Sequence, residues 1–427
     1  MAKETNPLTT IDQAELDKII ARHEAFRQGR SNGARAMLAH HDLSHLVFRG
    51  RDMAHADFTG SVIYEADFEN AILDFCLMYA CDLRKTNFHN ASLIRADLRG
   101  ACLRGAVMAG ADLTSADLRE GSFATFDPEK GLSFISESEA WKGGTGGVDM
   151  RGANLGSVKL SGAIATNSNF EDANLSKSVI VHGNLSGANL TGANLSGADL
   201  SQCEMRDVNL RGANLTGTLV DYSGLVNVDM TGALTDKPVG MTTENHEKSL
   251  EEMIRLHQAW LKSKGSEGQK LDLSGHDLRN APSLVGANLT MLLAEKTVWY
   301  GLDLSQVNLQ AAQLGEGDFR NCNFTGADLR GSQFKNCNMV GARCIRARLE
   351  PLQLDGNREL KTVFVGATLR YADFSQANLR DVNFTDADLS FANFSDANLR
   401  GTIFTNAKLH EAKIKMPSAQ PPAQKTE

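Results

Sequence analysis

The sequence of 427 residues lacks any run of about 18 consecutive apolar residues, the length that marks a membrane-spanning helix. Its first ten residues, MAKETNPLTT, lack the apolar core of a secretory signal peptide. The net charge of -8 is small for this length, and Lys and Arg are mixed with Asp and Glu. No basic face for direct nucleic-acid binding is therefore expected. We expect a cytoplasmic protein without a membrane span.

What the sequence has instead is a period of five residues. From Tyr371 to His410 it reads YADFS-QANLR-DVNFT-DADLS-FANFS-DANLR-GTIFT-NAKLH. Every fifth residue is large and apolar (the central position), and the residue two places earlier is small or β-branched (the small position). Asp or Asn usually stands between them (the polar position). This period fits neither a helix nor a strand, and a fixed repeat of this kind predicts a solenoid.

The motif resembles that of the pentapeptide-repeat family, A-[DN]-[LF]-X-X, over most of the chain. The resemblance implies an all-β solenoid, namely a right-handed quadrilateral β-helix in which four repeats form a coil of about 20 residues. It implies no enzyme activity, no cofactor and no metal. Function in such a family lies on surfaces carried by the fold, so the fold alone does not name it.

Packing inside such a coil agrees with the residues. Central and small side chains both point inward, and the small ones must be small because the large ones already fill the axis. Stacking of coils predicts columns of aromatic rings at intervals of four repeats. These columns are Phe48–Phe68–Phe88, Phe364–Phe384–Phe404 and Phe374–Phe394.

Breaks in the period divide the chain into segments. We expect a disordered N-terminus (1–14), a cap helix and turn (15–33), a first stack (34–123), an inserted loop (124–148), a second stack (149–235), a linker (236–248), a second cap helix (249–268), a third stack (269–414) and a disordered tail (415–427). The charged Glu359 at a central position predicts that the chain bulges outward there. A disturbance of the period is also expected at Trp299.

The two predicted helices are alike. Each has a histidine followed three residues later by an aromatic residue, His23 with Phe26 and His257 with Trp260, and each leads through a glycine-containing turn into repeats. We infer an internal duplication of helix plus stack. The first coil of a solenoid has unpaired strand edges that invite aggregation, and a helix with one apolar face would cover them.

Candidate metal ligands are few. Of the seven cysteines, Cys344 is central, Cys102 is outward and the rest are at small positions, namely Cys76, Cys81, Cys203, Cys322 and Cys337. This phase favours small core residues over a metal pair formed by Cys76 and Cys81, which remains the alternative. His40, His41 and His45 cluster without an acidic or Cys partner in register. His23 and His257 are expected to pack against the first coils.

Candidate catalytic groups are also weak. The repeat itself places carboxylates in pairs, so Asp and Asn at polar positions are structural first. The sequence GGTGG at 143–147 lacks the Gly-Lys-Ser/Thr ending that binds phosphate, and a flexible loop is the better interpretation. No catalytic or cofactor-binding set is found, and we expect a protein that is not an enzyme.

The inserted loop is the candidate partner-binding site, because long loops within regular scaffolds are often functional. Phe134, Ile135 and Trp141 are apolar residues in an otherwise polar segment. They either lie against the rod or anchor a protein partner, since aromatic residues dominate interface energetics. The leading hypothesis is a non-catalytic protein-interaction scaffold whose partner is another protein.

Two alternatives stay open. Some members of the family resemble duplex DNA in size and charge and protect DNA gyrase, which gives quinolone resistance. Acidic columns here are diluted by arginines such as Arg99, Arg119, Arg330 and Arg400. The family also allows a secreted bacterial effector.

Overall fold

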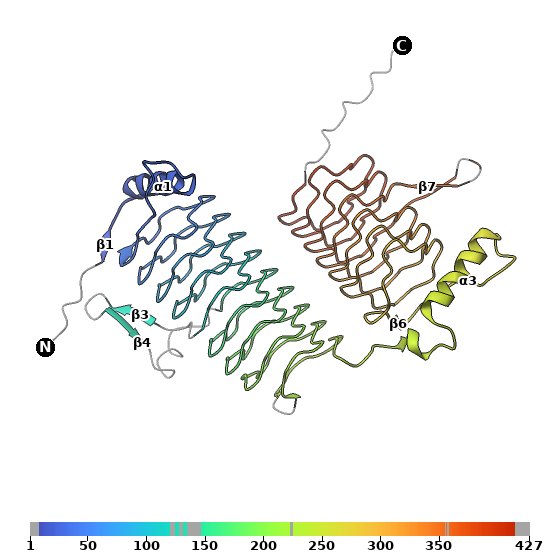
Figure 1. Cartoon of the computed structure of the whole chain (residues 1–427), viewed down its shortest axis with the longest axis horizontal. Helices are drawn as coiled ribbons and strands as arrows, with labels where there is room; N and C mark the ends of the chain where they lie inside the picture. Colours follow the sequence, from blue (N-terminus) through green and yellow to red (C-terminus); the bar gives the residue numbers. More distant parts are fainter. Residues whose placement is uncertain are drawn as a thin grey trace, which may run out of the picture. The chain divides into compact units, whose positions relative to one another are not determined.

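A computed structural model of the chain describes residues 8–119, 147–222, 225–354, 356 and 358–414, and the backbone of 124–127 and 131–134 (Figure 1). The chain divides into two compact units, Met1–Lys237 and Pro238–Glu427. The helices are α1 (Gln13–Arg27), the short 3-10 helix η3 (Thr243–Asn245) and α3 (Leu250–Lys262). The strands are β1 (Thr9–Thr10), β2 (His41–Asp42), β3 (Ala124–Asp127), β4 (Gly131–Phe134), β5 (Met241–Thr242), β6 (His276–Asp277), β7 (Leu352–Gln353) and β8 (Glu359–Leu360).

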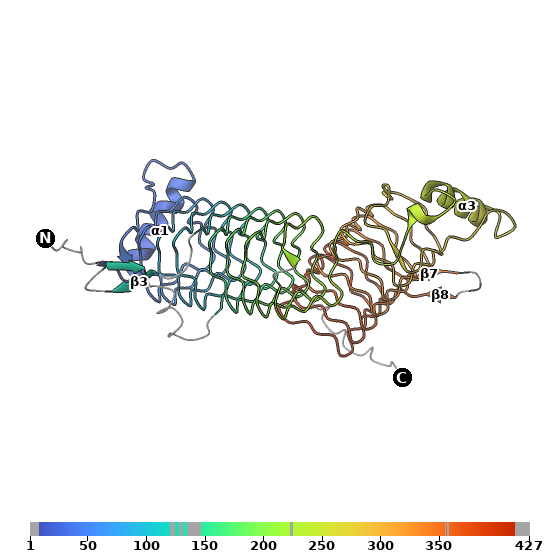
Figure 2. The same ribbon diagram turned by 90° about the horizontal axis from the view of Figure 1, so that it is seen from below.

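Most of each unit is held together by single parallel bridges between successive turns of the chain (Figure 2). Asp57 bridges to Leu77, and Asp67 bridges to Asn87, each pair being 20 residues apart. The backbone N–H of Phe48 donates to the carbonyl of Asp67 at 2.7 Å, and the N–H of Asp67 donates to Leu46 at 2.9 Å. Each segment of 20 residues, called a coil below, thus pairs with the next one, and each unit is a β-solenoid.

The core is a stack of central and small side chains. Leu195 and Phe384 have no exposed surface, and Ala193 and Val382, two residues before them, are equally buried. The predicted aromatic columns are confirmed. Ring centroids are 4.2 Å apart for Phe48 and Phe68, 5.3 Å for Phe68 and Phe88, 5.1 Å for Phe364 and Phe384, 5.6 Å for Phe384 and Phe404, and 5.4 Å for Phe374 and Phe394. Trp299 also keeps the period, because it is buried and stacks on Phe319 at 5.6 Å.

The chain before α1 differs from the expectation of disorder over residues 1–14. Thr9 and Thr10 pair in parallel with His41 and Asp42, and Asp12 forms a capping box with Glu15 at the start of α1. The side chain of Gln13 donates to the carbonyl of Val47 at 3.0 Å and accepts from its N–H at 2.9 Å. These contacts satisfy backbone groups of the first coil, which has no preceding coil to pair with.

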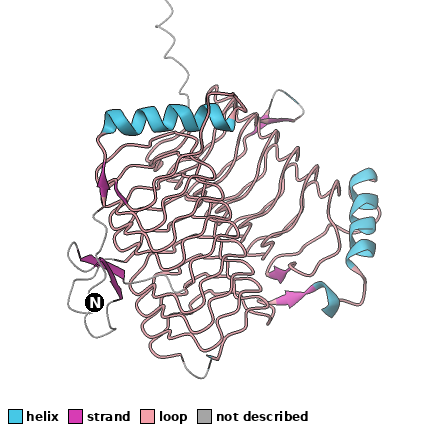
Figure 3. Ribbon diagram, turned by 60° about the vertical axis from the view of Figure 1, so that its left-hand side comes forward, coloured by secondary structure: helices cyan, strands magenta, loops and turns pink. Residues whose placement is uncertain are grey.

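The second unit begins in the same way, although residues 236–248 were expected to be only a linker. Met241 and Thr242 pair in parallel with His276 and Asp277, and η3 follows before α3 begins. Figure 3 shows α1 and α3 as the two long helices beside their coils. The period alone gives no sign of either two-residue strand, since each pairs with a partner about 30 residues away.

The buried histidines of the two caps make equivalent contacts. Nδ1 of His23 accepts from the N–H of Ala36 at 3.0 Å, and its Nε2 lies 3.1 Å from the carbonyl of Ala54. Nδ1 of His257 accepts from the N–H of Leu271 at 3.1 Å, and its Nε2 lies 2.9 Å from the carbonyl of Thr290. The recurrence of the whole arrangement supports the inferred duplication.

Two interruptions leave the solenoid intact. Bridges across the first insertion join Val107 to Asp149 and Asp117 to Lys159, so the coils of the second stack continue those of the first. The bulge expected at Glu359 is an antiparallel hairpin in which Leu352 pairs with Leu360. The coil resumes beyond it, since Gln333 bridges to Val363. Among the described residues, neither helix has the length and apolar character needed to cross a membrane.

The core predicts a contrast between neighbouring positions. Leu195→Asp should lower the free energy of unfolding by about 4 kcal/mol or more, because the carboxylate would be buried without a partner. Ser196→Asp, at the adjacent outward position, should change it by less than about 0.5 kcal/mol. Denaturant unfolding followed by circular dichroism measures both variants. Equal losses would contradict the inward orientation of the central residues.

The capping histidines predict a dependence of stability on pH. Burial lowers the pKa of His23 and of His257 below the ordinary value of 6.5. Below about pH 6.5 the unfolded chain therefore binds protons that the folded chain does not. The free energy of unfolding decreases as the pH is lowered through this range, by at most about 1.4 kcal/mol per pH unit for each histidine. Above that pH both states are neutral and this contribution vanishes.

Urea unfolding of the wild type and of His23→Asn at about pH 7.5 and pH 5.5 would test this dependence. Asn keeps an oxygen acceptor near the Nδ1 position but does not titrate. We expect the variant to lose less stability between the two pH values than the wild type. An equal loss would show that protonation of His23 does not contribute.

Candidate protein-interaction surface

The loop predicted to bind a partner lies only partly within the described residues. Its β3 and β4 pair antiparallel, with Ala124 opposite Phe134. Phe134 ends β4, and the description covers its backbone only. Ile135, Trp141 and the glycine-rich residues 143–146 lie outside the described residues. Their proposed contact with a partner therefore stays a prediction.

The cysteines act as small core residues. The thiol of Cys76 donates to the carbonyl of Met53 at 3.0 Å, and that of Cys81 donates to Phe58 at 2.9 Å. The hydroxyl of Ser61, at the same small position, donates to Leu38 at 2.6 Å in the same way. Burial raises the pKa of Cys81 to about 12. Such thiols are protonated at neutral pH and unreactive.

The histidine cluster near the first coil is split between separate partners. Nδ1 of His41 lies 2.8 Å from the carbonyl of Ala39, whereas Nδ1 of His45 lies 3.4 Å from the carboxylate of Glu65. Glu65 follows His45 by 20 residues, so the expectation that the cluster has no acidic partner in register is wrong. Within the part of the chain that the structure describes, no group of three or more His, Cys, Asp or Glu residues is placed to hold a metal ion.

Asp and Asn at polar positions stabilise the turns. The carboxylate of Asp57 accepts the N–H of Thr59 at 3.0 Å, which is the Asx turn that these residues favour. Where Arg follows two places later, it binds the same carboxylate. The closest N–O distances are 2.7 Å for Arg99–Asp97, 2.7 Å for Arg119–Asp117, 2.8 Å for Arg151–Asp149 and 2.7 Å for Arg330–Asp328. Much of the acidic surface is therefore neutralised locally.

One coil carries large apolar side chains at outward positions. Ile72, Phe75, Leu77 and Tyr79 are 42%, 42%, 37% and 46% exposed, and we call them the 72–79 patch. The equivalent residues are Asp52, His55, Asp57 and Thr59 one coil earlier, and Ser92, Arg95, Asp97 and Arg99 one coil later. The patch is thus a small apolar area bordered by polar and charged side chains, as interaction sites often are.

Phe75 occupies a backbone conformation that disfavours it. Its φ is 58°, in the left-handed region, where an L-residue costs about 1–2 kcal/mol relative to the right-handed one. The equivalent corner residues one coil earlier and one coil later, His55 and Arg95, also have left-handed φ, of 66° and 56°. Glycine would be less strained at this corner, but a left-handed φ is common to the corners of this solenoid and does not by itself distinguish Phe75.

Cations border the aromatic residues of the patch. The ring of Phe75 stacks on His55 with centroids 5.0 Å apart, and the guanidinium carbon of Arg95 lies 5.8 Å from the centroid of Phe75. The guanidinium carbon of Arg99 lies 5.7 Å from the ring centroid of Tyr79. Aromatic residues beside arginine are the composition enriched at the centres of protein interfaces. The sequence ILDFCLMYA carries this signal, because four of its outward positions, those of the 72–79 patch, are large and apolar.

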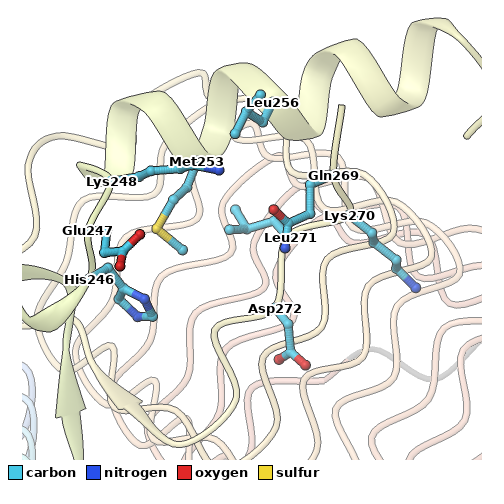
Figure 4. A pocket seen from close by; sticks show the side chains of 9 residues that line it. All are labelled: His246, Glu247, Lys248, Met253, Leu256, Gln269, Lys270, Leu271 and Asp272. Atoms are coloured by element: carbon cyan, nitrogen blue, oxygen red, sulfur yellow. The ribbon is translucent and has the colours of Figure 1, made fainter. Parts of the chain in front are cut away.

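Besides the 72–79 patch, the structure has a cavity under α3. A cavity of about 360 Å³ lies between the helix and the first coil of the second unit (Figure 4). Met253, Leu256 and Leu271 supply its apolar lining, and His246, Glu247, Lys248, Gln269, Lys270 and Asp272 supply the polar one. In the first unit, α1 buries both Leu16 and Ile20 against the coil, whereas the hydrophobic residue that α3 buries fully is Leu250.

The repeat pattern agrees with a known family. A model described as pentapeptide repeats matches residues 42–78, 71–108, 91–123, 149–192, 184–219 and 303–350, and one described as a pentapeptide repeat region matches 332–414. Together these ranges cover more than half of the chain. The chain belongs to the pentapeptide-repeat family. A search of curated proteins finds no match.

Solved structures of pentapeptide-repeat proteins are among those that match the chain. QnrB1, a plasmid-mediated fluoroquinolone resistance protein, is 17% identical, with 47% of this chain and 90% of that one covered and a TM-score of 0.29. HetL of Nostoc, involved in heterocyst differentiation regulation, is 20% identical, with 92% and 94% covered and a TM-score of 0.16. A protein of the Arabidopsis thaliana thylakoid lumen is 22% identical, with 36% and 65% covered and a TM-score of 0.12.

The buried cysteines predict a labelling pattern. In the native protein at about pH 8, Cys76, Cys81, Cys322, Cys337 and Cys344 should not react with a thiol reagent over hours, because they are buried and protonated. All should react within minutes in denaturing guanidinium chloride. Mass spectrometry of labelled peptides locates each site. Rapid native labelling of Cys76 and Cys81 would restore the alternative of a ligand pair.

Proposed function

We propose that the chain is a non-catalytic protein-interaction scaffold and that the 72–79 patch is a docking surface for a protein partner. The repeats form, in this proposal, a right-handed quadrilateral β-helix with four repeats per coil. Bridges between residues 20 apart and the five-residue period support this geometry. We retain the 124–148 loop as a second contact and the bacterial cytoplasm as the location.

The single observation that carries the proposal is the outward exposure of four large apolar side chains on one coil. Burying such side chains against a partner yields about 25 cal/mol per Å² of apolar surface, whereas leaving them in water yields nothing. The strained Phe75 adds no buried contact to the core, since its side chain lies outside the coil and 42% of its surface is exposed. We therefore propose that the side chain of Phe75 contributes binding energy at an interface with a partner.

DNA mimicry remains the alternative, and the surface weighs against it. A mimic of duplex DNA needs columns of uncompensated negative charge. Here Asp97 and Asp117, which lie in one column, each bind an arginine with bidentate geometry. Full gyrase supercoiling activity in excess protein would exclude this alternative. No feature of the described residues specifically favours the secreted effector.

A pair of patch variants separates binding from folding. Phe75→Asn should keep or raise the melting temperature, because Asn tolerates the left-handed conformation better than Phe. Combined with Tyr79→Ser, it should weaken partner capture by about tenfold or more, because hot-spot side chains carry most of the binding energy. Quantitative capture from cell extract, followed by titration of the purified partner, measures the loss.

The second unit offers a matched control. Tyr371 also has a left-handed φ, of 59°, and stacks on Phe391 with centroids 4.8 Å apart. Tyr371→Asn should leave capture unchanged. Trp141→Ala tests the inserted loop separately. Unchanged capture with both the patch variant and the loop variant, or turnover of a substrate by the purified protein, would refute the proposed function.

A further inference from the structure

The segment before α3, residues 239–248, runs beside the first coil of the second unit, and we call it the second strap. Its β5 pairs with β6, and the N–H of Val239 donates to the carboxylate of Asp277 at 2.9 Å. Further along, Nε2 of His246 lies 2.6 Å from Nε2 of His276, with ring centroids 4.9 Å apart and ring planes inclined by 13°, so that the two rings meet edge to edge. We propose that this histidine pair is a proton-operated latch that holds the second strap on its coil.

The hydrogen-bond partners of the two rings determine which of their nitrogens carry a proton. Nδ1 of His276 lies 3.1 Å from the carbonyl of Ser274, which can only accept, so Nδ1 carries a proton. In a neutral His276 the Nε2 atom is then the acceptor, and His246 donates its Nε2–H to it. The short contact is therefore one N–H···N hydrogen bond with one proton between the two nitrogens.

The two protonation steps have opposite effects. A first proton, at Nδ1 of His246, leaves the hydrogen bond in place and makes it charge-assisted. A second proton, at Nε2 of His276, places two N–H groups face to face and two positive rings in contact. The hydrogen bond between the two Nε2 atoms is then lost, and the two positive rings repel each other. Because the two rings share a proton, the steps belong to the pair and not to either residue.

The surroundings provide little compensation for the second charge. His276 is only 2% exposed, so its cationic form would lack water. Asp277 in the same strand is already bound by Arg279 at 2.6 Å. Among the residues that the structure describes, no ion pair of His246 or His276 is found, unlike those of His45 and His410.

The other charged groups near the latch come from every element around it. Glu244 belongs to η3, Glu247 and Lys248 follow it in the strap, and Lys270 and Asp272 line the adjoining cavity from the coil. The first turn of α3 adds Glu251 and Glu252, of which Glu252 binds Arg255. In Figure 4, His246 and Glu247 lie on the strap side of the cavity, so release of the strap would open the cavity on that side.

The first unit is an internal control. Its strap, residues 8–12, pairs with His41 and Asp42, and Nδ1 of His41 lies 2.8 Å from the carbonyl of Ala39. This arrangement repeats that of His276 and Ser274. The described strap of the first unit has no facing imidazole, because residues 8–12 contain no histidine and α1 begins directly after them. Only the second strap should therefore respond to acid through a histidine pair.

Hydrogen exchange of the full-length chain tests the latch. Between about pH 7.5 and pH 5, amides of residues 239–248 should exchange about tenfold faster after correction for intrinsic rates, because the strap opens locally. Amides of residues 8–12 and of the Phe364–Phe404 coils should keep their protection. Equal acceleration in the coils would mean unfolding of the whole unit and would overturn the proposal.

Three variants complete the test. His246→Gln keeps an amide that can donate to His276, or accept from it once it is protonated, so its strap should stay closed at both pH values. His246→Ala should exchange rapidly at both. His41→Gln in the first unit should leave the second strap acid-sensitive. Wild-type acid sensitivity in His246→Gln would overturn the proposal, since His257 and other groups would then be responsible.

Discussion

The interior of each coil has room for one large and one small side chain from every five residues, and the rest of the structure depends on this limit. Ala193 and Leu195, or Val382 and Phe384, fill their layer completely. A polar residue at a small position can use its polar atom locally, as Ser61 does by donating to the carbonyl of Leu38, although the buried hydroxyl of Ser178 has no partner. The thiols of Cys76 and Cys81 donate to backbone carbonyls in the same way as Ser61, and as buried core residues they are poorly placed to act as metal ligands or nucleophiles.

Because the inward positions are fixed, variation is confined to outward positions, corners, caps and insertions. Asp and Asn at polar positions are constrained by their turns, as Asp57 is by the N–H of Thr59. The remaining outward residues are free, and one coil uses that freedom for Ile72, Phe75, Leu77 and Tyr79. An interaction surface on this fold is thus a departure from the local pattern that leaves the core untouched.

The sequence predicts the structural features that repeat every five residues, and it does not predict the contacts of the irregular segments. The aromatic columns through Phe68 and Phe384 follow from spacing alone. The charge of Glu359 at a central position predicts a bulge there, but not that the bulge is a hairpin. The disturbance expected at Trp299 is wrong because an indole fits a central position when Phe319 follows it in the column. The pairing of Thr9 with His41, and of His246 with His276, has no periodic signal, since both join irregular segments about 30 residues apart.

The two caps solve the same edge problem with different residues. In the first unit, the amide of Gln13 satisfies both backbone groups of Val47. At the equivalent point of the second unit, after the turn in which Ala281 donates to Leu278 as Leu46 does to Leu43, the chain has Pro282, which has no N–H to satisfy. At this point the second cap therefore has no N–H for a side chain to accept. Its strap is fixed by β5, by the carboxylate of Asp277 and by the histidine pair.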